Sequence, residues 1–388
     1  MNNKTKIIIA VTLIVFTIGG WIYFFTRNNE KTIVSDLATT SPTFEPTPTP
    51  SNVSQEKTSY QNFVKLSNNF SLSPNISSNN ISFFDKQEGI FKKVVNILNT
   101  NQETKLSETV FTNILKIDWS NNQDKALIVY EDEGKIRYSL FDLSQDLIYL
   151  LPNYTTAINF SYDNKNFVIY HQDENNQNYL ATLSLDGTKE TKLLEINFSN
   201  IEVFSLNQNN LIFYQKPAPF MPIDGIFNYN LKNKSLTILP INLFDSTKLY
   251  GLEAKPSKDG NYLLFSATDS QNKNLELYVF DIATNKLLKM PFKSFIDKCT
   301  FSKDNKNVYC TYSNSFSDNN FSYPFDYYSG LVSSQDSFAK VNLETGEFKI
   351  FAENTPYDAY DLQVNEDEGL LVFINKYDGL LYELKLIN

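Results

Sequence analysis

Short apolar runs, each preceded by a cluster of polar turn residues, recur along the chain after residue 60. The turns are rich in Ser, Asp, Asn and Gly, which bend the backbone through side-chain hydrogen bonds and tolerate left-handed conformations. Runs such as ALIVY, FVIY, YLLF and LLVFI are too short for buried helices and are apolar on both faces, which is typical of strands in a sheet covered on both sides. The copies begin at residues 77, 120, 161, 206, 257, 302 and 365.

A second pattern follows each run: an amphipathic strand, a turn and another strand, as in YSLFDLSQDLIYLLP, YVFDIATNKLLKMP and AKVNLETGEFKIF. The apolar spacing of three and four residues that marks an amphipathic helix is missing, so each unit predicts a small antiparallel sheet. Units of this length that pack against like neighbours are typical of propeller blades. We therefore predict an all-β fold, a seven-bladed β-propeller of four-stranded antiparallel blades over residues 60–388, with about 47 residues per blade. Six or eight blades also fit, because the first copy is weak.

The last unit is one strand short, since it shows only YDLQV, LLVFIN and LLYELKLI. The stretch YQNFVKLS at residues 60–67 could supply the missing strand. That pairing would join the start of the propeller to the end of the chain and remove an exposed sheet edge.

The phrases FSYDNKNFVIY, PSKDGNYLLFS and FSKDNKNVYC resemble the WD40-like propeller repeats of the TolB type, with their Ser-x-Asp-Gly/Asn turn. The resemblance covers residues 70–388 and implies a propeller with a habit of protein binding. One His and two Trp do not supply the His and Trp-Asp pair that each true WD40 blade carries. The additional N-terminal α/β domain of TolB is not visible in this sequence, so the resemblance implies no Tol-Pal role.

The N-terminal stretch IIIAVTLIVFTIGGWIYFF, residues 7–25, contains no charged residue and follows a short tail at 1–6. As a helix it would span roughly 28 Å, close to the thickness of the bilayer hydrocarbon core. Trp21 and Tyr23 lie toward its end, where amphipathic rings favour the membrane interface. We predict a single transmembrane helix that acts as a signal anchor. A cleaved signal peptide is the alternative, although its apolar part is usually shorter and no A-x-A-like site follows.

Residues 26–59 are rich in Thr, Ser and Pro and nearly devoid of apolar side chains, which predicts a disordered, extended linker. Lys4 and Lys6 precede the apolar stretch, whereas Arg27 and Lys31 follow it. The positive-inside rule slightly favours a cytoplasmic N-terminus, with the propeller on the outer side at the cell surface or in the periplasm. A disordered tether on the cytoplasmic side is the alternative.

The sequence shows few residues or motifs that are typical of a catalytic, metal or nucleic-acid site. Its net charge of −10 argues against nucleic-acid binding, which depends on clustered Lys and Arg. One His and two Cys do not make a zinc site, and we expect neither a metal nor a cofactor. His171 is interpreted as a solvated loop residue. No G-x-S-x-G or phosphate-binding loop occurs, so we name no catalytic residue.

Cys299 and Cys310 flank the turn KDNK symmetrically, so the two side chains should face each other across a hairpin. The separation of such positions allows a disulfide. The matching residues of the copy at 160–171 are Ile158 and Ile169, so the two cysteines could equally be small buried apolar residues. An oxidising compartment would favour the disulfide.

Two insertions break the repeat, at 215–225 and 313–336, and both follow the second strand of their unit. Second-to-third-strand loops emerge on one face of a propeller, so we expect the two insertions to lie together. Their aromatic side chains predict a binding surface for a protein or a carbohydrate. The candidate binding residues are Phe220, Phe316, Phe321, Tyr323, Phe325, Tyr327 and Tyr328. Alternatively, the longer insertion folds back to plug the central channel or to cap its blade.

We predict a membrane-anchored, extracytoplasmic, non-catalytic interaction or scaffold module whose partner is a protein or a surface polysaccharide. The alternative is a carbohydrate-binding or glycosidase-type or other hydrolase propeller with carboxylates at the central channel. An enzyme should present several acids from the inner strands to one pocket. The inner-strand segments show scattered acids such as Asp118 and Glu253, which favours binding over catalysis.

Overall fold

The computed structural model describes residues 63–77, 80–95, 102–172, 175, 177–244 and 246–386. The chain divides into two units, Met1–Lys57 and Thr58–Asn388, and the described residues all belong to the second. The predicted transmembrane segment 7–25 and the linker 26–59 lie outside the described residues. Within the described ranges, no helix is long and apolar enough to cross a membrane.

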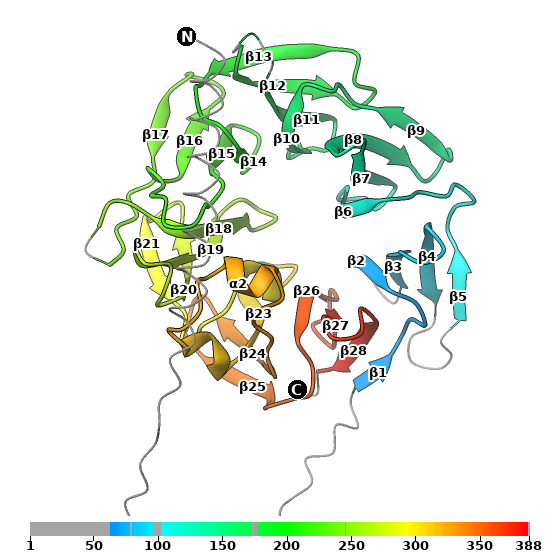
Figure 1. Ribbon diagram of the computed structural model, residues 1–388, viewed down its shortest axis with the longest axis vertical. Helices are drawn as coiled ribbons and strands as arrows, with labels where there is room; N and C mark the ends of the chain where they lie inside the picture. Colours follow the sequence, from blue (N-terminus) through cyan, green and yellow to red (C-terminus); the bar gives the residue numbers. More distant parts are fainter. Residues whose placement is uncertain are drawn as a thin grey trace, which may run out of the picture. The chain divides into compact units, whose positions relative to one another are not determined.

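The described residues form seven four-stranded antiparallel sheets that are arranged in a ring (Figure 1). This confirms the predicted seven-bladed propeller. Blade 1 contains β2 (Ser71–Ser77), β3 (Asn80–Asp85), β4 (Ile90–Val95) and β5 (Gln102–Lys105). Blade 2 contains β6 (Ile114–Trp119), β7 (Lys125–Asp132), β8 (Lys135–Asp142) and β9 (Leu147–Leu150). Blade 3 contains β10 (Thr155–Phe160), β11 (Asn166–His171), β12 (Tyr179–Ser184) and β13 (Glu190–Glu195).

The second half of the ring follows the same order of strands. Blade 4 contains β14 (Ile201–Ser205), β15 (Asn210–Gln215), β16 (Phe227–Asn230) and β17 (Leu236–Ile238). Blade 5 contains β18 (Tyr250–Pro256), β19 (Tyr262–Thr268), β20 (Glu276–Asp281) and β21 (Lys286–Lys289). Blade 6 contains β22 (Cys299–Phe301), β23 (Asn307–Tyr312), β24 (Ser337–Asn342) and β25 (Phe348–Ala352). Blade 7 contains β26 (Ala359–Val364), β27 (Leu370–Asn375), β28 (Leu381–Lys385) and β1 (Phe63–Lys65).

Blade 7 closes the ring, because its outer strand comes from the start of the propeller. Phe63 pairs with Leu384 and Lys65 pairs with Tyr382 in an antiparallel register. This confirms the prediction that residues 60–67 supply the missing fourth strand. The chain therefore enters the ring beside the C-terminal end of β28, so both ends of the propeller lie on the same face.

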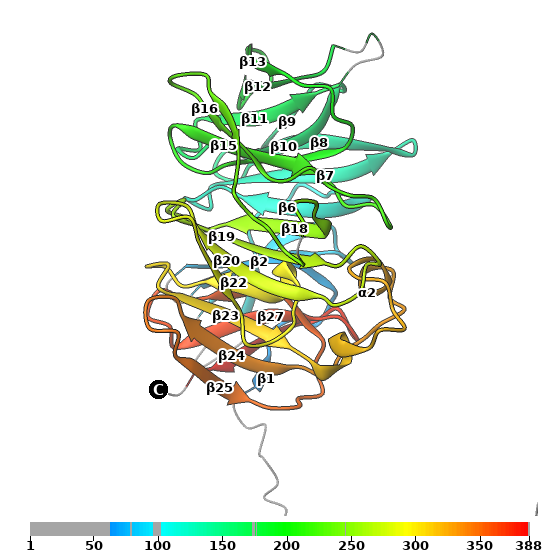
Figure 2. The ribbon, with the colours of Figure 1, turned by 90° about the vertical axis from the view of Figure 1, so that its left-hand side faces the viewer.

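The strands alternate in direction, and this sorts the connections onto two faces. The turns between first and second strands and between third and fourth strands lie on one face, together with both ends of the propeller. The loops between second and third strands and the links between blades lie on the opposite face, which we call the insertion face. Both insertions are on it, and Figure 2 shows the helix α2 (Phe325–Tyr328) projecting there, away from the C-terminus.

The recurring turn joins the first two strands of a blade, as its repetition predicts. In blade 6, the Ser302 hydroxyl donates to Asp304 at 2.7 Å and accepts the backbone N–H of Asn307 at 3.0 Å. Asn305 has a φ of 56°, a left-handed conformation that Asn tolerates. Blade 3 repeats the contact between Ser161 and Asp163 at 2.8 Å. The Ser and Asp residues that recur in the repeat are thus the ones that form the hydrogen bonds of this hairpin turn.

The core lies between the blades, where apolar side chains from adjacent sheets interdigitate. Phe91 of blade 1 stacks on Phe141 of blade 2 with ring centroids 5.4 Å apart, and both rings are fully buried. Burying one such ring contributes about 1.5–3 kcal/mol. Because each blade is apolar on both faces, every sheet depends on two neighbours, and only a closed ring supplies two neighbours to all of them.

Cys299 and Cys310 are register partners in the first hairpin of blade 6, and the structure records a disulfide between them with Cα atoms 4.1 Å apart. Ile158 and Ile169 are register partners at the matching place in blade 3. Both cysteines are buried, so the bond joins the two inner strands from within the core. The oxidising compartment that would favour it stays a prediction.

Glu383 in β28 is an unusual member of the core of blade 7. Its side chain is fully buried, and neither carboxylate oxygen has a hydrogen-bond partner. Burial raises the pKa of Glu383 to about 7, while the nearby Lys385 ammonium acts in the opposite direction. Its register partners are Val64 in β1 and Val372 in β27, so an uncompensated acid lies in the sheet that closes the ring.

We therefore expect Glu383→Leu to stabilise the propeller at alkaline pH. The pKa of Glu383 is higher in the folded than in the unfolded chain. Its contribution to the free energy of unfolding is therefore fully present below the unfolded value of 4.5 and is lost as the pH rises through about 7. Urea unfolding at pH 8 should show the variant more stable than the wild type by about 1–3 kcal/mol, with a smaller difference at pH 5. The control Glu347→Leu replaces an exposed acid and should show no such pH dependence. An equal effect of Glu383→Leu at both pH values would contradict the explanation.

Candidate functional site

The longer insertion folds back against the ring through its aromatic residues. Phe316, in the short helix η2 (Asn314–Ser317), is buried, as are Tyr323 and Tyr327. They pack against Phe295 from the link between blades 5 and 6, and the Phe295 and Tyr327 rings stack with centroids 4.4 Å apart. The expectation that these three aromatic residues are exposed for binding was therefore wrong, because the link between the blades offers them an apolar surface.

The other predicted binding residues remain wholly or partly accessible. Phe220 is 62% exposed and Tyr328 is 42% exposed, whereas Phe321 and Phe325 are half-buried. Folding back therefore buries one side of the insertion and leaves the other on the insertion face. His171, interpreted as a solvated loop residue, is instead buried at the end of β11, and its ring stacks with the rings of Tyr154 and Tyr179.

A buried ion cluster ties the insertion to blades 6 and 7. Lys298 ends the short helix η1 (Ile296–Lys298), is 0% exposed, and donates to Asp336 at 2.6 Å and to Asp358 at 2.7 Å. The Tyr327 hydroxyl donates to Asp358 at 2.9 Å. Burial raises the pKa of Asp336, and the positive charge of Lys298 opposes this rise. One lysine thus pairs with two buried carboxylates, Asp336 at the end of the longer insertion and Asp358 at the end of the link between blades 6 and 7.

Asn272 joins the two insertions. It is fully buried in the turn between β19 and β20. Its side-chain oxygen accepts the backbone N–H of Phe220 from the shorter insertion, and its backbone oxygen accepts the N–H of Tyr323 from the longer one at 2.7 Å. These bonds hold the backbone on either side of the exposed residues, so the insertion face of blades 4, 5 and 6 forms one surface.

Tyr328 connects this surface to the central channel. Its hydroxyl donates to the Glu253 carboxylate of β18 at 2.8 Å, and the charge of Asp297, in the link before blade 6, acts on the same hydroxyl. Figure 1 shows α2, which carries Tyr328, beside β18 on the inner side of the ring. Burial raises the pKa of Glu253 well above its usual value, and the nearby Asp297 charge adds to the rise. The Tyr328 pKa is raised for the same reasons.

The inner strands bring further charges into the same channel. Burial raises the pKa of Asp361 in β26 to about 6, an effect opposed by Lys255 and reinforced by Asp297. Lys116 and Asp118 of β6 also act on Asp361, and they pair with each other at 2.9 Å. The Lys116 side chain is 61% exposed although it lies inside the ring, so solvent reaches these groups. Acids that look scattered along the sequence are therefore gathered in space.

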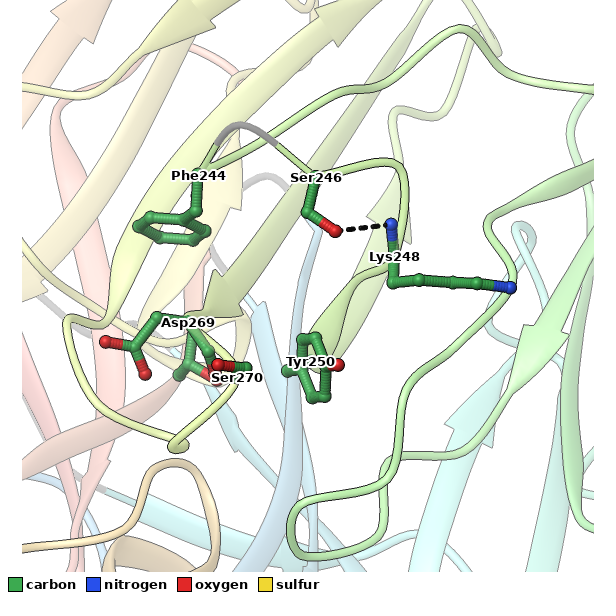
Figure 3. A pocket seen from close by; sticks show the side chains of 7 residues that line it. Phe244, Ser246, Lys248, Tyr250, Asp269 and Ser270 are labelled. Carbon is green, nitrogen blue, oxygen red and sulfur yellow. Dashed lines mark hydrogen bonds between the residues drawn. The ribbon is translucent and has the colours of Figure 1, made fainter.

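Exposed apolar side chains also lie in the loops of the insertion face. Met221 is 59% exposed beside Phe220, and Leu331, just after α2, is 70% exposed. Phe244 lines a pocket of about 190 Å³ between the link that precedes blade 5 and the turn after β19 (Figure 3). Lys248, Tyr250 and Asp269 also line it, as Figure 3 shows. The pocket is small, so it fits a side chain rather than a large ligand.

Comparison with known proteins identifies the fold and no more. No family model matches the chain, and no curated protein matches its sequence. An oligogalacturonate lyase in complex with manganese is similar over 80% of this chain and 86% of its own, at 14% identity and a TM-score of 0.56. The Cps50 (Swd1) β-propeller domain of Myceliophteria thermophila is similar over 84% of this chain and 100% of its own, at 10% identity and a TM-score of 0.52.

TolB from Acinetobacter baumannii is also among the structural neighbours, with 84% of this chain and 64% of TolB covered, 12% identity and a TM-score of 0.45. At these identities, the likenesses show the propeller fold alone. The sequence has one His, and among the described residues no three His, Cys, Asp or Glu side chains lie close enough together to hold a metal ion.

Sequence reasoning located the insertions but missed the residues that order them. Lys298 and Asn272 lie in short links with ordinary composition, and only the ring places them beside the longer insertion. Asp297, next to Lys298, was likewise not singled out. Glu253 was noted as an acid of an inner strand, but the sequence carried no sign that Tyr328 would bond to it.

We expect Lys298→Met to destabilise the propeller by about 3–5 kcal/mol, because it leaves two buried carboxylates without a positive charge. The insertion should also become accessible, so limited proteolysis should cut within 313–336 faster than in the wild type. Lys303→Met is the matched control, since Lys303 pairs with Glu366 at 2.6 Å in an exposed position and should contribute less than about 1 kcal/mol. Equal unfolding free energies for the two variants would exclude a structural role for the cluster.

Proposed function

We propose that the protein is a membrane-anchored, extracytoplasmic propeller that binds a partner through the insertion face without catalysing a reaction. The observation that carries this proposal is the surface formed by Phe220, Met221 and Leu331. These side chains are exposed, yet the loops that bear them are held by buried hydrogen bonds and by packed aromatic rings. Apolar side chains on an ordered frame lose little conformational entropy on binding, which favours affinity.

The path of the chain supports the same proposal. Phe63 lies beside the end of β28, on the face opposite to the insertion face. A tether that joins the propeller there starts away from the insertion face and leaves that face available. With an anchor at residues 7–25 and the propeller on the outer side of the membrane, the partner would be another envelope protein or a surface polysaccharide.

Site-specific photo-crosslinking in cells tests this proposal with the full chain. A photoreactive phenylalanine at Met221 or Leu331 should give adducts of higher mass, whereas the same residue at Lys165 should not. Lys165 is a suitable control because it is exposed in a turn of blade 3 on the opposite face. Adding Leu331→Ser should weaken the adduct formed from position 221. Adducts of equal yield from all three positions, or from none, would refute the proposed surface.

A second candidate function is glycoside hydrolysis, and the Tyr328 contacts favour it specifically. The Tyr328 hydroxyl donates to the Glu253 carboxyl group at 2.8 Å, and the Asp297 charge acts on both groups, so two acids of the kind that glycosidases use meet at the channel. Glu253, whose pKa is raised, would donate the proton to the leaving oxygen, and Asp297 would be the nucleophile. The acidic channel and the net charge of −10 favour a neutral sugar over an acidic one.

A screen of neutral aryl glycosides and polysaccharides decides between the two candidates. If the wild type hydrolyses any of them, Glu253→Gln should lower the rate by about 100-fold or more, because it removes the acid. Glu202→Gln should have a smaller effect, since Glu202 pairs with Lys216 at 2.9 Å and has no contact with Tyr328 among those described. No turnover by the wild type on the whole panel would eliminate the glycosidase candidate.

A further inference from the structure

The mouth of the channel carries negative charge that the described part of the chain does not neutralise. Asp118 and Glu202 pair with Lys116 and Lys216, each at 2.9 Å. Glu253 and Asp297, in contrast, have no Lys or Arg within salt-bridge distance among the described residues, and Glu253 accepts a hydrogen bond from the neutral Tyr328 hydroxyl instead. Asp361, also in the channel, adds a further carboxyl group that is influenced by Asp297.

The uncompensated acids lie next to the exposed apolar side chains. Tyr328 is bonded to Glu253, and Leu331 follows it three residues later, with its backbone N–H donated to Asp326 of α2 at 2.9 Å. Phe220 and Met221 adjoin the longer insertion through Asn272. An occupant of this surface therefore meets carboxylates at the channel and apolar groups on the rim.

Charge complementarity decides which occupant fits. A polyanion would be repelled, and an anionic membrane surface would be repelled for the same reason. A neutral sugar would leave the two carboxylates without a counter-charge. A Lys or Arg side chain would supply a positive charge beside both acids, and it could also lie against the Tyr328 ring, which attracts cations. Apolar residues beside it would cover Leu331 and Met221.

From this arrangement we propose that the partner presents a peptide segment in which Lys or Arg residues stand beside apolar residues, with the cation at Glu253 and Asp297. This inference rests on the proposed function and names the partner's chemistry. The Tyr328 hydroxyl would keep its hydrogen bond to Glu253 while the incoming cation binds Asp297. Binding would replace a repulsive carboxyl pair with a salt-bridged one, so the affinity should fall as salt screens the contact.

Fluorescence anisotropy with the purified full chain in an uncharged detergent tests the proposal. Three labelled hexapeptides serve as probes: alternating Lys and Leu, alternating Glu and Leu, and alternating Lys and Ser. The Lys–Leu peptide should bind at least about tenfold more tightly than the other two in low salt, and more weakly in high salt. Measuring each variant of the chain in the same detergent corrects for peptide bound to the micelle.

Variants of the chain locate the binding. The double variant Glu253→Gln with Asp297→Asn should lose about tenfold or more in affinity for the Lys–Leu peptide, and Leu331→Ser with Met221→Ser should lose a similar factor. The matched controls are Glu366→Gln, an exposed acid paired with Lys303 in a turn on the opposite face, and Ile148→Ser, an exposed apolar residue on the outer strand of blade 2. Both controls should leave the affinity unchanged. Circular dichroism checks that each variant is folded.

The outcomes separate this inference from the proposed function. If the three peptides bind equally, or if the variants on the insertion face change nothing, the inference is overturned. Crosslinks from positions 221 and 331 together with no preference for the basic peptide would leave the binding surface standing and exclude a basic partner. If positions 221 and 331 give no crosslinks and the basic peptide is not preferred, the proposal that the insertion face binds a partner is also refuted.

Discussion

Closure of the ring by β1 and β28 is the constraint on which the rest of this structure depends. Three residue pairs form the strand ladder of this joint among the described residues, yet they supply the outer strand of blade 7 and bring the two ends of the propeller together. Each blade is apolar on both faces, so an open ring would leave two sheets with a bare face. The joint is therefore worth far more than its own hydrogen bonds, because packing between blades 7 and 1 requires it. Blade 7 also contains Glu383, a buried acid without a hydrogen-bond partner, so we expect the stability of this joint to depend on pH.

The closed ring also brings the two insertions together on one face. A propeller places all second-to-third-strand loops on one face, so two insertions nearly a hundred residues apart in the chain become neighbours. Contact alone would not order them, since long loops have many conformations to lose. The order comes from buried polar groups in the frame: Lys298 between two carboxylates, and Asn272 between two backbone segments. Half of the aromatic residues in the longer insertion are buried in this anchoring, and the other half remain wholly or partly accessible.

The same geometry concentrates charge. Acids from the inner strands of different blades point toward a common axis, where protein surrounds them on all sides and like charges lie close to one another. Both effects oppose ionisation, which is why the pKa values of Glu253 and Asp361 are raised. Solvent still reaches the channel, so these groups are available to a ligand. A group of acids is thereby formed where the insertion meets the channel, although the sequence contains no catalytic motif.

The sequence by itself determined the blades, because their turns and apolar runs are local features that repeat. The Ser-Asp turn, the repeated four-stranded unit, the register of Cys299 with Cys310 and the closing strand at 60–67 all follow from spacing along the chain, whereas the structure fixed the number of blades at seven. Only the tertiary structure decided which aromatic residues are buried and which acids share a channel. Phe316 and Tyr328 look alike in the sequence, but the first meets the apolar link before blade 6 and the second reaches Glu253. Burial of a loop residue depends on the surface that the rest of the ring presents to it, and that surface is built from segments far away in the chain.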